Sequence, residues 1–210
     1  MLNVVVDLSH HNTVTSFQDA KNNGVLGVIH KATEGINFVD AKYSSRRVRA
    51  LSNGLLWGAY HFATKGNVQG QVNHFLDIVE PEPTDLIVLD FEPNHISGTM
   101  TLAEAEQFVT LIHAQTGRYP GLYSGASFLR ERLGNRQPAD TILSECFLWI
   151  AKYSSGLPTV PPAFPRFTFW QYTDGNNGDQ PHQVPGIGRC DRNKFNGSLE
   201  GLQRLWGVNQ

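Results

Sequence analysis

The chain has few cysteines, almost no net charge and no long apolar run. Cys146 and Cys190 are its only cysteines among 210 residues, which is too few for a disulfide scaffold and lacks the short spacing of a zinc knuckle. We expect both to be free thiols. With 17 basic and 19 acidic residues the formal charge is 17 − 19 = −2, so nucleic acid or an anionic membrane is not an expected partner.

Membrane, export and metal signals are also missing from the sequence. No apolar run reaches the ~18 residues of a membrane-spanning helix, and residues 1–7 lack the basic segment and apolar core of a signal peptide. We therefore expect any release from the cell to use another route. His10 and His11 are neighbours on a predicted extended segment and so point to opposite faces, hence we expect no catalytic metal and no other cofactor.

The composition that is present, 40% hydrophobic and 10% aromatic residues in 23.4 kDa, predicts one globular domain over residues 1–210 with its core at about 3–206. Short β-rich runs alternate with helical patterns. The predicted strands are 4–7, 25–31, 55–62, 86–92, 119–123, 147–152 and 167–172, and the predicted helices are 15–22, 40–52, 68–78 and 101–115. The last helix opens with Thr101 and Glu104 at the spacing of a capping box. Such alternation predicts an α/β fold with a parallel sheet closed into a barrel.

The second half of the chain departs from this alternation. Residues 154–166 are rich in proline, and residues 173–188 are rich in Gly, Asn, Asp and Pro. Loops are expected to replace helices there. We therefore predict an irregular or incomplete (β/α) barrel that resembles a TIM barrel.

The sharpest chemical signal is the pair Asp90 and Glu92 at the end of the apolar run 86–89. Side chains two apart on a strand leave the same face, with Cα atoms about 6.5 to 7 Å apart. Two carboxylates that close cannot both ionise freely, so one pKa should rise, as in glycosidases. The alternative is an Asp-x-Glu in a solvated turn. Pro93 and the buried-looking run favour the strand end.

Other polar and aromatic residues also gather where predicted strands end, which is the functional face of a barrel. They are Asp7, Lys31, Glu34, Tyr60, Phe62, Tyr123, Trp149, Tyr153, Trp170 and Tyr172. Carboxylates and flat rings together suit a sugar-binding groove. Singly, each has a simpler interpretation: an aromatic ring can be core, Glu34 can pair with Lys31, and Asp7 can serve a turn.

Seven segments, in chain order between about residues 4 and 198, resemble glycoside hydrolase family 25, the Chalaropsis-type lysozymes. They are Val6 to Asn12 (VDLSHHN), Lys31 to Gly35 (KATEG), Gly58 to Phe62 (GAYHF), Leu89 to Glu92 (LDFE), Leu148 to Tyr153 (LWIAKY), Trp170 to Tyr172 (WQY) and Asp191 to Phe195 (DRNKF). The resemblance implies a flattened, modified β/α barrel. It also implies cleavage of the β-1,4 bond from N-acetylmuramic acid to N-acetylglucosamine in peptidoglycan.

The resemblance further implies a nest of four acids, which are Asp7, Asp90, Glu92 and Asp191 here. We expect Glu92 to act as general acid and then base. Asp90 is expected to stay ionised and to assist the substrate's own acetamido group, with retention. Asp7 and Asp191 would tune charge and hold sugar or water. Asp191 is the hardest to place, because its Gly- and Pro-rich approach obscures an eighth strand.

Several alternatives remain open at this point. The chain could be a binding module that grips glycan without cutting it, although retention of Asp90 and Glu92 opposes this. It could cut another N-acetylated glycan, such as chitin. Biologically, a holin-released phage lysin and a secretion-system effector with an immunity partner both fit, and both act on the bacterial wall.

Overall fold

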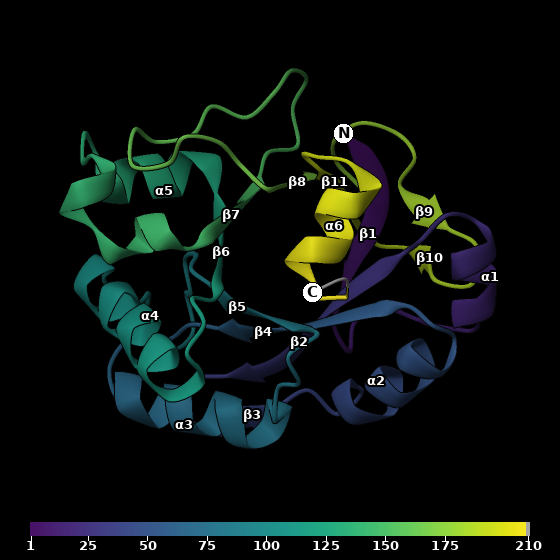
Figure 1. Cartoon of the computed structure of the whole chain (residues 1–210), viewed down its shortest axis with the longest axis horizontal. Coiled ribbons are helices and arrows are strands. Elements are labelled where there is room, and N and C mark those ends of the chain that lie inside the picture. Colours follow the sequence, from purple (N-terminus) through teal and green to yellow (C-terminus); the bar gives the residue numbers. More distant parts are fainter. Residues whose placement is uncertain (209–210) are drawn as a thin grey trace.

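The protein is a closed α/β barrel, as predicted. The computed structural model describes residues 1–208, so the last two residues of the domain predicted over 1–210 lie outside the described part. The barrel wall is shown in Figure 1. Its strands are β1 (Leu2–Leu8), β2 (Gly27–Glu34), β4 (Leu56–Phe62), β5 (Asp85–Asp90), β6 (Gly121–Gly125), β7 (Phe147–Ala151), β8 (Phe169–Thr173) and β11 (Asp191–Phe195).

The sheet order is β1-β11-β8-β7-β6-β5-β4-β2, and pairing of β1 with β2 closes the ring. The barrel is therefore irregular but not incomplete. All neighbours are parallel except β11, which runs antiparallel to both β1 and β8. This corrects the expectation of a parallel sheet at one strand. Because β11 is reversed, its first residue, Asp191, pairs with Asp7 near the end of β1.

Helices cover the outside of the barrel. They are α1 (Phe17–Asn22), α2 (Tyr43–Ser52), α3 (Val68–Val79), α4 (Leu102–Thr116), α5 (Ala126–Leu133) and α6 (Leu199–Leu205), with 3-10 turns η1 (Pro138–Asp140) and η2 (Ile142–Glu145). The first four confirm the predicted helices, and Thr101 with Glu104 forms the predicted capping box. Helices α5 and α6 were not predicted. None of the helices within residues 1–208 is both long and apolar enough to cross a membrane.

The loop-rich second half follows the prediction. The proline-rich segment 154–166 has no helix or strand, and the only strands within 174–190 are the short hairpin β9 (Gln183–Val184) and β10 (Gly188–Arg189). Strand β3 (Phe38–Val39) pairs with the end of β2 and lies outside the closed ring. Cys146 and Cys190 are buried free thiols, as expected.

Two apolar layers hold the barrel together. The outer layer lies between strands and helices, and the inner layer fills the barrel with side chains such as Val5, Ile29 and Phe169. Helix α6 closes the N-terminal end of the barrel by inserting Trp206, which is 1% exposed. The Trp206 Nε1 donates to the backbone oxygen of Trp57 at 2.7 Å, and its ring meets Phe169 edge-on at 5.8 Å. The open, polar end is thus the opposite one.

Candidate active site

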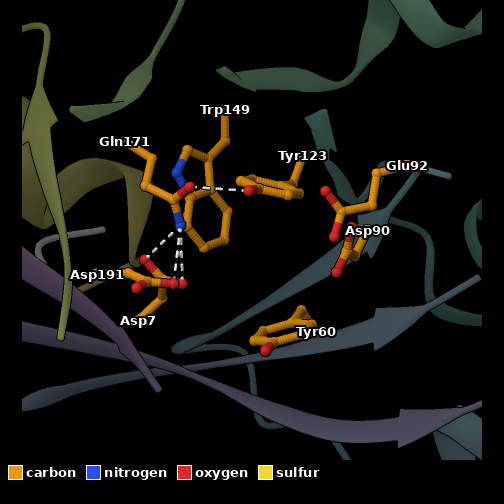
Figure 2. Close-up of a pocket in the computed structure, with 8 residues that line it drawn as sticks. All are labelled: Asp7, Tyr60, Asp90, Glu92, Tyr123, Trp149, Gln171 and Asp191. Atoms are coloured by element: carbon orange, nitrogen blue, oxygen red, sulfur yellow. Dashed lines mark hydrogen bonds between the residues drawn. The ribbon is translucent and has the colours of Figure 1, made fainter. Parts of the chain in front are cut away.

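A cavity of about 80 Å³, open to solvent, lies at the C-terminal end of the barrel. Its lining combines four carboxyls, three aromatic rings and one amide, all shown in Figure 2. The residues are Asp7, Tyr60, Asp90, Glu92, Tyr123, Trp149, Gln171 and Asp191. All four acids predicted from the sequence therefore meet in one cavity, although they come from three separate parts of the chain.

Strand β5 delivers Asp90 and Glu92 to this cavity. Every residue of the strand is buried, and it ends at Asp90, two residues earlier than predicted. Phe91 is fully buried in the outer core, while Asp90 and Glu92 line the cavity on the other side. The alternation expected for an extended chain thus persists past the strand end. Asp90 is 6% exposed, and its Oδ1 has no hydrogen-bond partner within the described residues.

Burial raises the pKa of both carboxyls in this pair. The pKa of Glu92 rises to about 7 through burial and the nearby charge of Asp7, while Lys31 opposes the rise. The pKa of Asp90 rises well above its usual range through burial and then through the charge of Glu92. In the structure, no donor in the described chain offsets the burial of Asp90, so its carboxylate is less favoured than it would be in water. That Asp90 is ionised during the reaction stays a prediction.

Asp7 and Asp191 form the second acid pair, across the β1–β11 ladder. Burial raises the pKa of Asp7, but hydrogen bonds from Asn193 and Gln171 oppose this. Burial and the charge of Asp7 raise the pKa of Asp191 to about 9. A hydrogen bond between the two carboxyls lowers the pKa of Asp7 and raises that of Asp191. Asp191 therefore holds the proton, and Asp7 is the best-supported anion of the cavity.

Gln171, which was not among the predicted site residues, fixes the orientation of Asp7. Its Nε2 lies 3.0 Å from each carboxylate oxygen of Asp7, and its Oε1 accepts from the hydroxyls of Tyr123 (2.8 Å) and Tyr153 (2.5 Å). Two hydroxyl donors on the oxygen define which way the amide faces. Asn193 adds a second amide donor to Asp7 at 2.8 Å. Both amides are buried and occupy inward positions on β8 and β11.

The predicted aromatic residues divide between two faces of the barrel. Tyr60, Tyr123 and Trp149 line the cavity, and Tyr153 reaches it through its bond to Gln171. Trp149 donates from Nε1 to Asn193 Oδ1 at 2.7 Å, so its ring is held by a hydrogen bond as well as by packing. These four residues are in a position to contact a ligand.

Trp170 and Tyr172 are not brought into the cavity, which corrects their predicted placement. They belong to the outer core, and Trp170 donates to the backbone oxygen of Lys152. Side chains alternate along β8, so a cavity-facing Gln171 forces both neighbours outward. The same alternation separates Gln171 from its two neighbours in the sequence, but it does not show which face of β8 turns inward.

Lys31, Glu34 and Phe62 lie beside the cavity without being part of its lining. Lys31 Nζ lies 2.6 Å from Glu34 Oε2 and 4.9 Å from the centre of the Phe62 ring. The simpler interpretation of Glu34, a partner for Lys31, is thus what the structure contains. Asn94 also donates to Glu34 Oε1 at 3.1 Å. Lys31 remains near enough to the acids to lower the pKa of Asp90 and Glu92.

The arrangement suits proton transfer to a neutral polar substrate. It offers one carboxyl that titrates near pH 7, a second that lacks a donor, and rings on which a sugar can pack. Within residues 1–208, no group of three or more His, Cys, Asp or Glu side chains is placed to hold a metal ion.

Comparison with known proteins points to the same chemistry. The sequence profile described as Glycosyl hydrolases family 25 matches residues 6–180. The chain is similar to "Lysozyme M1" of Streptomyces globisporus, with 31% identity over 95% of this chain and 70% of that protein. It is similar to the "N,O-diacetylmuramidase" of Chalaropsis sp, with 29% identity over 95% and 96%. A muramidase structure from Acremonium alcalophilum matches with TM-score 0.83 and 30% identity, covering 100% of both chains.

Proposed function

Because the chain belongs to family 25 of the glycosyl hydrolases, we propose that it is a lysozyme that cuts bacterial peptidoglycan. The bond is the β-1,4 linkage from N-acetylmuramic acid to N-acetylglucosamine. The observation that carries this proposal is the position of Glu92 in the acid-lined cavity, where its pKa is raised to about 7. We further infer that the core of the catalytic domain spans about residues 3–206.

Glu92 is the general acid in this proposal. Its raised pKa keeps a proton available at neutral pH for the leaving oxygen of the glycosidic bond. Once that oxygen has departed, the same carboxylate takes a proton from the incoming water. A group that gives and then recovers a proton in one cycle works best with a pKa near the working pH.

Asp90 is the group that assists the substrate's 2-acetamido substituent. Its unpartnered Oδ1 is ready to accept a hydrogen bond from the acetamido N–H. That bond supplies the donor that the protein does not, so substrate binding lowers the pKa of Asp90 and favours its carboxylate. The oriented acetamido oxygen then attacks the anomeric carbon, and water completes the reaction with retention. Substrate-assisted routes of this kind depart from the usual two-carboxylate scheme.

Asp7 and Asp191 complete the charge balance. Asp7 is the anion that stabilises positive charge developing on the sugar ring, and Asp191 shares its proton with Asp7. Tyr60, Tyr123 and Trp149 provide surfaces for the sugar rings. Replacing Asp90 by Asn should impair turnover severely, while Tyr123→Ala should mainly weaken binding.

The cellular setting is a separate part of the proposal. A lysozyme of this kind acts on the bacterial wall, either as a holin-released phage lysin or as a delivered effector. In the second case a neighbouring gene should encode an immunity protein. Genomic context distinguishes these two settings.

The first test is mass spectrometry of the soluble products from purified peptidoglycan after borohydride reduction. The native protein should release fragments with reduced muramitol ends, and Glu92→Gln should release none. Glu131→Gln, which changes an exposed glutamate on α5, is the matched control and should behave as native. Glucosaminitol ends would contradict the bond assignment. No products from peptidoglycan, with products from chitin oligomers, would redirect the substrate; no products from either would favour a binding module.

A further inference from the structure

A line of rings leads away from the acid cavity to the rim of the barrel. Phe62 lies on β4 two residues after cavity-lining Tyr60. The ammonium of Lys31 lies 4.9 Å from the centre of the Phe62 ring and 5.0 Å from that of Phe38. The rings of Phe38 and His10 are 5.8 Å apart, and those of His10 and His11 are 3.9 Å apart. We call Phe62, Phe38, His10 and His11 the ring row.

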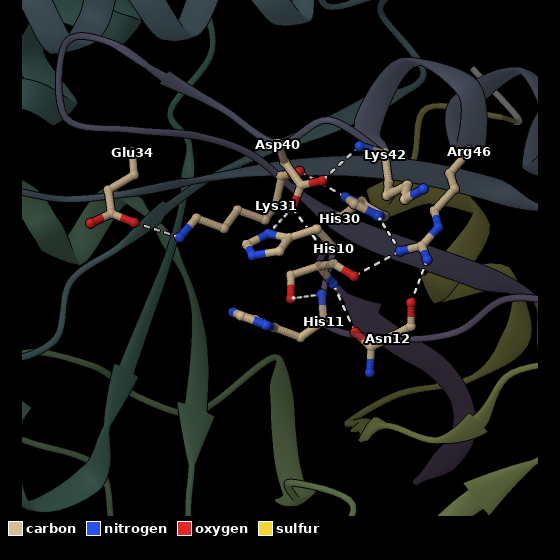
Figure 3. A network of polar contacts seen from close by, with 10 residues as sticks. His10, His11, Asn12, His30, Lys31, Glu34, Asp40, Lys42 and Arg46 are labelled. Carbon is tan, nitrogen blue, oxygen red and sulfur yellow. Dashed lines mark hydrogen bonds and ion pairs between the residues drawn. The ribbon is translucent and has the colours of Figure 1, made fainter.

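The polypeptide holds the outer half of the ring row in place. Phe38 is carried by β3, which pairs with Glu34 at the end of β2. His10 is held by the buried carboxylate of Asp40, which accepts from the His10 backbone N at 2.7 Å and lies 3.0 Å from its Nδ1. Figure 3 shows this network, with His10 and His11 extending from the same loop.

Arg46 holds both ends of that loop by hydrogen bonds. It donates from Nη1 to Ser9 O at 2.7 Å and from Nη2 to Asn12 O at 2.5 Å, on either side of the two histidines. The rings are therefore presented by a loop with fixed ends. A surface that is fixed before binding loses less conformational entropy when a ligand arrives.

The exposure and charge of the ring row define the ligand that suits it. Phe38 is 41% exposed and His11 is exposed, so both leave ring surface in water. Lys31 is paired with Glu34 at 2.6 Å, which leaves no net charge from that pair. Flat rings with polar nitrogens and a neutralised ion pair match a neutral, hydroxylated ring whose C–H face is apolar. The ring of a sugar residue has this chemistry.

We propose that the ring row binds further sugar residues of the same glycan strand, beyond the two that flank the cleaved bond. The inference rests on the proposed function, because it assumes a glycan in the acid cavity. Continuity carries it: Phe62 pairs with cavity-lining Asp90 in the β4–β5 ladder, and the Lys31 ammonium lies near the rings of both Phe62 and Phe38. The ring row thus makes the protein favour long strands over short fragments.

Binding can be tested apart from cleavage in the Glu92→Gln protein, by calorimetric titration with peptidoglycan glycan strands of two and six sugars. The six-sugar strand should bind more tightly than the disaccharide. Adding Phe38→Ala should weaken the affinity for the six-sugar strand about three- to tenfold and leave the affinity for the disaccharide unchanged. Phe38→Trp should retain the advantage, because it restores a ring.

Val39→Ala is the matched control. Val39 is 40% exposed and follows Phe38 on β3, so its side chain leaves the opposite face of the strand. It should leave the length dependence intact. Phe38→Ala should melt at the same temperature as its parent. If it then weakens the binding of short and long strands equally, or of neither, the proposal is overturned. If the native protein cuts no glycan yet Phe38→Ala still removes the length dependence, the proposed function fails and the ring row stands.

Discussion

The two ends of the barrel interior are built in opposite ways. At the C-terminal end, four carboxyls share one cavity, and burial raises the pKa of each. At the N-terminal end, α6 inserts Trp206 against Phe169 and the other inner apolar side chains. One end carries uncompensated polar groups, such as Asp90 Oδ1, while the other carries close apolar packing.

The difference assigns a separate task to each end. Crowded acids oppose folding at neutral pH, because ionising them in a buried cavity is unfavourable. Apolar packing favours folding and is indifferent to pH. We infer that the stability supplied around Trp206 offsets the cost of the acid cavity. Changes at the two ends should therefore separate activity from stability.

The largest effect on activity is expected at the acid end, from Glu92→Gln. The amide has nearly the same shape but no proton to transfer, so turnover should fall about 10²- to 10⁴-fold. The release of reducing ends from peptidoglycan measures the loss. A melting temperature equal to or above that of the native protein would show that the variant still folds. A native rate from this variant would remove Glu92 from its role.

The largest effect on stability is expected at the other end, from Trp206→Ala. Truncating a buried tryptophan leaves a cavity and should cost about 3–5 kcal/mol of unfolding free energy. Denaturant titration measures it, and the rate per folded molecule should stay near native. Leu199→Ala, an exposed residue of the same helix, should cost far less. Equal losses of unfolding free energy in the two variants would contradict the special role of Trp206 in closing the N-terminal end of the barrel.

Gln171→Glu should damage the acid cavity without changing its volume. A carboxylate there would face Asp7 at about the 3.0 Å now spanned by the amide donor, so Asp7 would turn or take up a proton. Turnover should fall on the order of 10²-fold, as for other small misplacements of reacting groups. Gln183→Glu on β9, an exposed position, is the control. A native pH–rate profile from Gln171→Glu would show that Asp7 needs no such donor.

Asp90→Asn should stabilise the protein while inactivating it. The folded-state pKa of Asp90 lies well above its usual range, so its favourable contribution is complete at low pH and is lost as the pH rises through the folded value. Asparagine does not ionise, so the variant does not lose this stability as the pH rises. The melting temperature of the variant relative to native should therefore rise between pH 4 and pH 8. Asp77→Asn, an exposed residue on α3, should show no comparable trend.

The smallest change is a shift in pH dependence from Lys31→Met. The general acid must be protonated, so the rate of the native protein should fall above the Glu92 pKa of about 7. Lys31 lowers that pKa, and its removal should move the falling limb to higher pH. Profiles of kcat/KM measure the shift. Lys42→Met, which changes an exposed lysine at the start of α2, is the control. If the falling limb moved to lower pH instead, Lys31 would raise the pKa of Glu92 rather than lower it, and the prediction would be wrong.

Much of the fold was readable from the sequence because its signals are local. Alternation of β-rich and helical runs predicted the seven parallel barrel strands and four of the six helices, and the capping box at Thr101 was correct. Helices α5 and α6 were missed. They are short, with 8 and 7 residues, and packing rather than periodicity decides whether such short helices form.

The acid site was readable for a related reason. Period-two alternation alone puts Asp90 and Glu92 on one face, and the end of the first predicted strand indicates Asp7. The family resemblance grouped these three acids with Asp191. The same alternation, applied to β8, separates Gln171 from Trp170 and Tyr172. What alternation does not reveal is which face turns inward, because that depends on how the strand sits in the closed sheet.

The sequence by itself therefore determined the barrel, its acidic strand end and the family to which the chain belongs. Only the tertiary structure decided that β11 runs antiparallel and sets Asp191 against Asp7, that Gln171 faces the acids, and that Asp90 lacks a donor. The physical reason is range. Propensity and periodicity act over neighbouring residues. Burial, pKa and hydrogen bonding depend on groups that closure of the barrel brings together from distant positions, such as Asn193 and Asp7, which are 186 positions apart.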